Sequence, residues 1–156
     1  MDELRFMTQK RSAIIRGLLY RPFLFYAVHN EQQLDPELNS RLNGFVQKGL
    51  QACTELSCGE GMTHRHHGSF YGVREALISS LMLIAANMNG IISWTTPSQS
   101  QSMTTSGGNE TASQETQYGR AVRLSLERMQ YWEAENLDAA RGLEILRTLL
   151  GVAQGQ

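Results

Sequence analysis

The sequence of 156 residues has only two cysteines and no long apolar run. These absences argue against a disulfide-stabilised secreted protein and against a membrane-spanning protein. Cys53 and Cys58 fall on different faces of one expected helix, so two free, buried or half-buried thiols and a reducing compartment are expected. The most apolar stretch, 76–88, is shorter than the roughly 20 residues of a membrane-spanning helix. The acidic start Met1-Asp2-Glu3 differs from a secretory signal peptide. We therefore expect an intracellular, soluble protein with no membrane partner.

An excess of charge of one sign is also missing. The chain has 14 basic and 15 acidic residues, a formal net charge of -1 and a pI near 6.4. Binding to a phosphate backbone usually requires a basic excess, so no direct nucleic-acid binding is expected. With 41% apolar and 19% charged residues, the composition is typical of a globular protein, and we expect one domain over 1–156.

The signature motifs of common enzyme classes are missing as well. The sequence contains no Gly-x-Ser-x-Gly nucleophile elbow, no phosphate-binding Gly-x-x-x-x-Gly-Lys-Ser/Thr loop and no dinucleotide-binding Gly-x-Gly-x-x-Gly. Histidines follow Cys53 and Cys58 along the chain, but a buried structural thiol is the simpler interpretation of each cysteine. We expect no enzyme activity, no catalytic residue and no cofactor.

What the sequence does contain is apolar residues repeating at three- and four-residue steps. With no alternating strand pattern, this predicts an all-α fold, an irregular bundle of about five helices. The helices expected from this periodicity cover 2–29, 36–58, 70–89, 121–132 and 138–150, with Gly90 and Gly151 as stops after the third and fifth.

Several residues predict local features of these helices. Pro22 should kink or restart the first helix. Asp35 is a favoured N-cap for the second helix, and Pro36 is a favoured first helical residue. Ser69 can cap the third helix, which is apolar nearly all round in its second half and should be central and buried. Gly44 and Gly49 each weaken their helix by about 1 kcal/mol relative to alanine, and could allow close helix contact.

A polar stretch over 95–116 differs in kind from the rest. It consists largely of Ser, Thr, Gln, Gly and Asn, which cannot bury enough apolar surface to offset their ordering entropy. We expect a long disordered loop inside the fold, which marks either a function or a tolerated insertion.

His64, His66 and His67 form the densest cluster of metal-binding side chains. Three imidazoles could serve zinc or nickel, with Cys53 or Cys58 as a further ligand. One short loop rarely supplies a closed tetrahedral site, however, and a polar loop leading into the next helix explains the same residues. We therefore predict no metal site.

Three stretches carry a family resemblance. The first is Leu19–His29, with Tyr20, Arg21, Pro22 and Phe23 ahead of a histidine. The second is Arg65, His66, His67 and Gly68 ahead of an apolar helix. The third is Tyr131–Glu135 leading into Asp138–Arg141. In this order they resemble segments of the fungal-specific regulatory (middle homology) domain of binuclear zinc cluster transcription factors.

The resemblance implies a helical regulatory module in the nucleus that controls transcription by contacting other subunits or sensing a small molecule. The family's six-cysteine zinc cluster and the first half of its regulatory domain have no counterpart here, so zinc and DNA binding are not carried over. We expect the final third of a longer protein, a short separate gene product or a truncated gene model. Partners would be the rest of the transcription factor, a second copy or a small-molecule effector.

The roles of the motif residues stay open at this point. Arg21, Arg65 and His66 would lie at the inner edge of the bundle, or form buried structural hydrogen bonds. Phe23, Phe25 and Tyr26 are interpreted as core, with a docking surface or a pocket wall as alternatives.

The expected helices carry more apolar surface than they can cover among themselves. The alternative functions are a stand-alone helical binding module and a small metal-dependent enzyme that uses the histidine loop.

Overall fold

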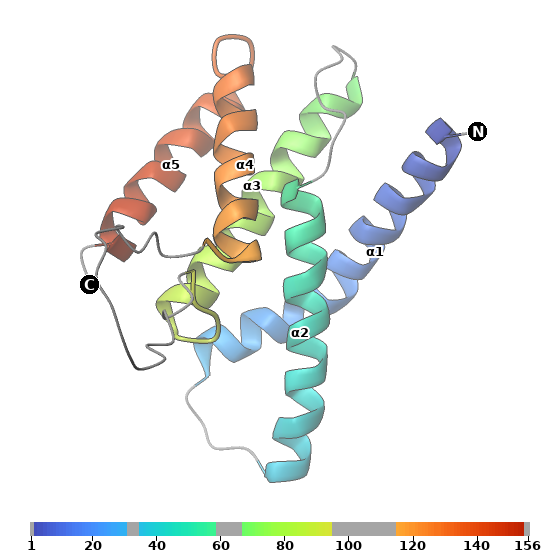
Figure 1. The fold of residues 1–156 in the computed structure, drawn as a ribbon, viewed down its shortest axis with the longest axis vertical. Coiled ribbons are helices and arrows are strands. Elements are labelled where there is room, and N and C mark those ends of the chain that lie inside the picture. The colour runs from blue at the N-terminus through green and yellow to red at the C-terminus, as the bar shows by residue number, and fades with distance from the viewer. Residues whose placement is uncertain (1, 31–34, 59–66, 95–114, 155–156) are drawn as a thin grey trace, which may run out of the picture.

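The computed structural model describes residues 2–30, 35–58, 67–94 and 115–154, and this part of the chain forms an all-α bundle of five helices (Figure 1). The predicted fold class is confirmed, while residues 95–114 of the predicted disordered loop lie outside the described residues. The helices are α1 (Asp2–His29), α2 (Pro36–Cys58), α3 (His67–Met88), α4 (Gln117–Trp132) and α5 (Leu137–Gln154).

Side-chain caps fix where α2 and α5 begin. The Asp35 carboxylate accepts a hydrogen bond of 2.9 Å from the backbone N–H of Glu37, and α2 starts at Pro36, as predicted. The amide oxygen of Asn136 accepts the backbone N–H of Asp138 at 2.9 Å, so α5 starts at Leu137. Each cap satisfies a backbone donor that the first turn leaves without a partner.

Of three further predicted helix ends, one is confirmed and two differ from the structure. Gly90 has φ +69°, a left-handed conformation, and ends α3 as predicted. Gly151 was expected to stop the last helix, but it lies inside α5, because a glycine costs a helix only about 1 kcal/mol. The third helix begins at His67 and not at Phe70, so Ser69 is in its first turn and not at its cap. The first turn of this helix contains no residue of the apolar stripe, so apolar periodicity could not locate the start of the helix.

Helix α1 is continuous through Pro22, and its ribbon changes direction along its length (Figure 1). The proline ring crowds the carbonyl of the preceding turn and removes one backbone donor, which bends a helix without necessarily ending it. The predicted kink is therefore present and the predicted alternative, a restart, is not.

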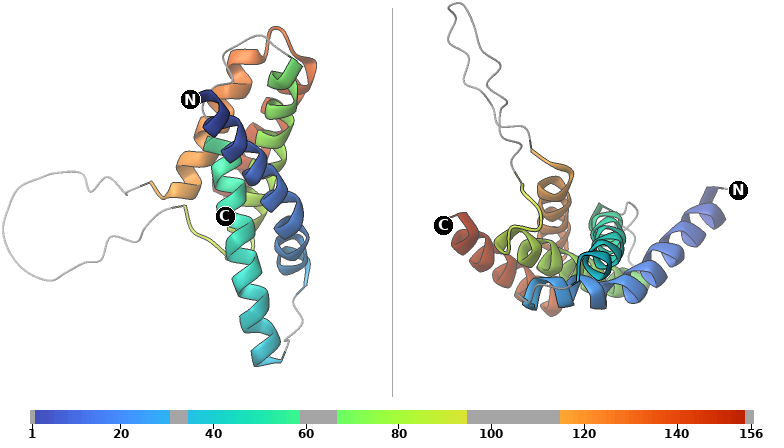
Figure 2. Two further views of the ribbon diagram at one scale, coloured as in Figure 1. Left: turned by 90° about the vertical axis from the view of Figure 1, so that its right-hand side faces the viewer. Right: turned by 90° about the horizontal axis from the view of Figure 1, so that it is seen from below.

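The core is centred on α3, which packs against every other helix, as predicted for the most apolar segment. The first half of α1 lies at the edge of the bundle opposite α5, and the second half of α1 runs back across the bundle (Figures 1 and 2). Within the described ranges, no helix combines the length and the hydrophobicity needed to cross a lipid bilayer. The largest fully buried apolar side chains are Leu24, Leu50, Val73, Leu83, Ile84, Met129, Leu143 and Leu146.

The described residues on either side of 95–114 are joined by hydrogen bonds. The backbone N–H of Thr116 donates to the Trp94 carbonyl at 3.1 Å, and its hydroxyl donates to the Ser93 carbonyl at 3.1 Å. The same hydroxyl accepts the N–H of Gly119 at 3.4 Å and so caps α4. Ser93, Trp94 and Thr116 therefore lie side by side.

Candidate functional site

The first family-like stretch lies in the second half of α1, and its arginine points into the bundle. A guanidinium nitrogen of Arg21, Nη2, is 3.0 Å from Oε2 of Glu75 on α3, and the two side chains are only 17% and 24% exposed. The Nε atom of Arg21 is buried and has no acceptor among the described residues. Arg21 therefore makes a partly buried polar contact that joins α1 to α3.

Cys53 of α2 is fully buried beside this ion pair. Burial, with a smaller contribution from nearby Glu75, raises the pKa of its thiol to about 11 against the opposing effects of Arg21 and Ser79. Burial likewise raises the pKa of Cys58, against the opposing effect of Arg120 and Arg128. Both thiols are free and protonated at neutral pH, which makes them poor nucleophiles and fits the predicted structural role.

Tyr20 and Phe23 of the same stretch lie against α2 in an aromatic cluster. The Phe45 ring is 4.7 Å from the Phe23 ring and 6.1 Å from the Tyr20 ring, between centroids. The Lys48 ammonium lies 5.4 Å from the Tyr20 centroid and 5.8 Å from that of Phe45. Phe23 is half-buried and Phe45 exposed, so the cluster forms a partly covered junction with a cation at its edge.

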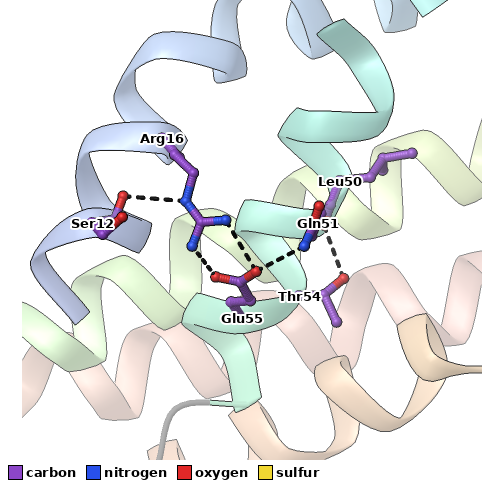
Figure 3. A network of polar contacts seen from close by, with 6 residues as sticks. All are labelled: Ser12, Arg16, Leu50, Gln51, Thr54 and Glu55. Carbon is purple, nitrogen blue, oxygen red and sulfur yellow. Dashed lines mark hydrogen bonds and ion pairs between the residues drawn. The ribbon is translucent and has the colours of Figure 1, made fainter. Parts of the chain in front are cut away.

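A polar groove of about 480 Å³ opens next to this cluster, between α2 and the start of α4. Glu55 at its edge is held by α1, since both of its carboxylate oxygens accept hydrogen bonds from Arg16 at 3.3 and 2.5 Å (Figure 3). Gln51 donates to the same carboxylate at 3.1 Å. The groove is lined by Gln47, Lys48, Gln51, Thr54, Glu55, Gln117 and Tyr118.

The opposite side of α1 is exposed and apolar. Its side chains recur at three- and four-residue steps along one stripe, and four of them are between 56% and 64% exposed. We call this stripe the outer face of α1. It consists of Ile15, Leu18, Leu19, Pro22, Phe25 and Tyr26.

The outer face corrects the interpretation of the aromatic run as core. Phe25 and Tyr26 are exposed, and Leu24 between Phe23 and Phe25 is the residue that is fully buried. A helix that is apolar on two faces gives no periodicity signal for which face is covered. The covered face here is the one with the small residues Ala13 and Gly17, and a Cβ at Gly17 would lie 3.1 Å from the Leu56 side chain of α2.

The second family-like stretch falls mostly outside the described residues. Arg65, His66 and the preceding His64 are not described, and His67 and Gly68 are described only as the start of α3. In the described part of the chain, no three His, Cys, Asp or Glu side chains gather as metal ligands would.

The third family-like stretch ends α4 and leads into α5. Trp132 is buried, and the exposed Tyr131 ring stands edge-on to it at 5.3 Å between centroids. Asn136, four residues after Trp132, is the cap of α5. This stretch therefore shapes the corner between α4 and α5 (Figure 1).

Sequence reasoning missed Glu75 as the partner of Arg21, although a signal was present. Glu75 is the sole acidic residue between His67 and Met88, in an otherwise largely apolar helix. An acid in that position predicts a buried cationic partner, since an unpaired charge is costly to bury.

Comparison of the chain with known protein families, with curated proteins and with solved structures finds no match.

Proposed function

We propose that this chain is a regulatory and interaction module of a fungal transcription factor, without a DNA-binding zinc cluster of its own, that acts in the nucleus by protein contact. The outer face of α1 carries this proposal. It is an exposed apolar stripe on a helix whose position is fixed from the inside by Arg21 and Glu75. A rigid helix with an apolar outer face loses little entropy when a partner binds.

The resemblance of the three stretches supports the transcriptional part of the proposal. The Leu19–His29 stretch holds both the half-buried Arg21 and most of the outer face, so one segment of sequence would fix the helix and present it. The partner would be the remaining part of a transcription factor or another copy, and its binding would shift the activity of the assembly.

A tethering assay in yeast tests this function. The chain is fused to a heterologous DNA-binding domain, and transcription of a reporter with the matching site is measured. We expect a change of several-fold over the DNA-binding domain alone, lost in L18E and retained in I145E. Ile145 is the matched control, because it is an exposed apolar residue on α5. A wild-type fusion that leaves transcription unchanged contradicts the proposal.

The polar groove between α2 and α4 favours a second candidate, a stand-alone module that binds a small molecule. Its volume of about 480 Å³ lies in the range of ligand sites, and Lys48 and Tyr118 offer polar contacts. Because Arg16 neutralises Glu55, the Lys48 ammonium would favour an anionic ligand. A thermal-shift screen with small carboxylates and phosphates tests this. We expect stabilisation of the wild type that K48M abolishes, and no response in either protein contradicts it.

A further inference from the structure

We propose that the occupant of the outer face of α1 is a second copy of this chain, packed antiparallel about a two-fold axis near Leu18 and Leu19. The inference rests on the proposed interaction role of this face and names its partner. Three observations carry it, namely the extent of the apolar face, the accessibility of α1, and the different chemistry at the two ends of the stripe.

The outer face has the extent that a weak dimer needs. From the exposed fractions of its side chains, it presents apolar surface on the order of 500 Å², large for a patch on a monomer. Two such faces with their flanking side chains would bury roughly 1,200 Å², the lower limit of specific protein interfaces. We therefore expect a dimer that dissociates in the micromolar range and not a permanent one.

The position of α1 leaves this face accessible to a second helix. Among the described helices, α1 packs only against α2 and α3, and it lies at one edge of the bundle (Figure 2). Ala13, Gly17 and Leu24 line the inner side, so the outer face points away from the core. A two-fold axis through an edge helix brings the same stripe of both copies together, and the contact closes after two copies.

The two ends of the stripe complement each other and set the direction of packing. Exposed Arg11 lies two turns before Leu18, and Phe25 lies two turns after it, each about 11 Å away along the helix. In an antiparallel pair each Arg11 guanidinium reaches the Phe25 and Tyr26 rings of the other copy, a favourable cation–π arrangement.

Other occupants fit the same face less well. A parallel pair would place Arg11 against Arg11, and would also bring the exposed Arg5 side chains together. A partner with an acidic surface would neutralise these arginines but leave the aromatic half of the stripe without a complement. An anionic lipid surface would attract the arginines but would not form the paired Arg11–Phe25 contacts of a two-fold dimer, and it is one outcome of the test.

Sedimentation velocity between about 5 and 200 µM tests the dimer on the full chain. We expect the wild type and I145E to shift from monomer to dimer with concentration, and L18E to stay monomeric with an unchanged helical circular dichroism spectrum. A wild type that is monomeric throughout overturns the inference, as does dimerisation that L18E leaves intact. A monomer that floats with phosphatidylserine vesicles also overturns it and assigns the face to lipid.

Cross-linking with a short bismaleimide tests the direction of packing in a C58S background. We expect L18C to cross-link to itself, and R11C to cross-link to Y26C when the two variants are mixed. Self-cross-linking of R11C and of Y26C, without the mixed product, indicates a parallel pair and contradicts the proposal. If the chain is monomeric but still changes reporter transcription, the dimer proposal is wrong and the proposed function stands. If the chain dimerises but has no effect on the reporter, the proposed function is wrong and the dimer proposal stands.

Discussion

Gly49 of α2 lies against the backbone of Tyr20 of α1, so that a Cβ at position 49 would come within 3.2 Å of the Tyr20 carbonyl oxygen and 3.4 Å of the Leu24 Cβ. A backbone carbonyl inside a helix cannot rotate away as the end of a side chain can. The glycine is therefore what allows the two helices to approach, and the predicted role of Gly49 is confirmed. Gly44 has no neighbour within 4 Å of such a Cβ, and the same prediction is wrong for it.

The first prediction follows from this pair of glycines. G44A should stabilise the protein by up to about 1 kcal/mol, because alanine is the better helix former and nothing is displaced. G49A gains the same helix propensity but has to push α1 away, and overpacking costs about 1 to 3 kcal/mol. Denaturant unfolding of the two variants measures this. Equal stabilisation by both would show that the helices do not meet at Gly49.

The second prediction concerns the half-buried pair of Arg21 and Glu75. R21M leaves the half-buried Glu75 carboxylate without its cation, and should lower the free energy of unfolding by about 1 to 3 kcal/mol, between the values for an exposed and a buried pair. The double variant R21M/E75M should recover much of this loss, since it leaves no charge unpaired. The exposed pair Arg41 and Glu37, with side chains 71% and 76% exposed, is the control.

R41A at that control pair should cost less than about 0.5 kcal/mol, because solvent screens the interaction. The comparison uses denaturant unfolding of all the variants under one set of conditions. If R21M and R41A are equally mild, Arg21 does not anchor α1.

The third prediction is the pH dependence that Cys53 confers. Its pKa is about 11 in the folded protein against 9.0 for an ordinary thiol. Below pH 9 the thiol is protonated in both states and its full contribution to stability is present. As the pH rises through 9 towards 11, the unfolded chain loses the proton first, so stability falls.

Between pH 8 and pH 10 this contribution should fall by about 1 kcal/mol. The difference in unfolding free energy between the wild type and C53A should shrink by that amount over this range. C58A serves as control, because Cys58 is only half-buried, and its difference from the wild type should change less. A constant difference for C53A would mean that water reaches the thiol.

Particular residues show how far the sequence could predict this fold. Asp35-Pro36 and Gly90 act through local backbone chemistry, so their roles could be inferred from neighbouring residues alone. Gly151 has the same residue type as Gly90 but remains helical, because the cost of a glycine inside a helix is only about 1 kcal/mol. Local signals thus predicted the helices and most of their ends.

The candidate sites depend on contacts between helices, which the sequence predicted less well. Apolar residues surround α1, so periodicity could not distinguish its inner face from its outer face. The Arg21–Glu75 contact joins residues that are 54 positions apart, and the chain offers several other arginines as partners. The polar groove likewise requires α2 and α4 to meet, which no single segment encodes.

The last prediction concerns the polar stretch between α3 and α4. Thr116 is bonded to Ser93 and Trp94, so the two flanks already lie together in the bundle. Replacing residues 97–113 by a short Gly-Ser linker should therefore preserve the fold. If the stretch is the flexible insertion that its composition indicates, shortening it also lowers the entropy cost of closing the loop, by about 1 kcal/mol for a fourfold reduction in length. The shortened chain should then unfold at a slightly higher denaturant concentration, with the same helical circular dichroism spectrum.

T116A combined with the short linker is the matched variant, and it should lose part of the gain because the hydroxyl contacts to Ser93 and Gly119 disappear. A shortened chain that is less stable than the wild type would mean that the stretch packs on the bundle, and its composition would then mark a function and not an insertion.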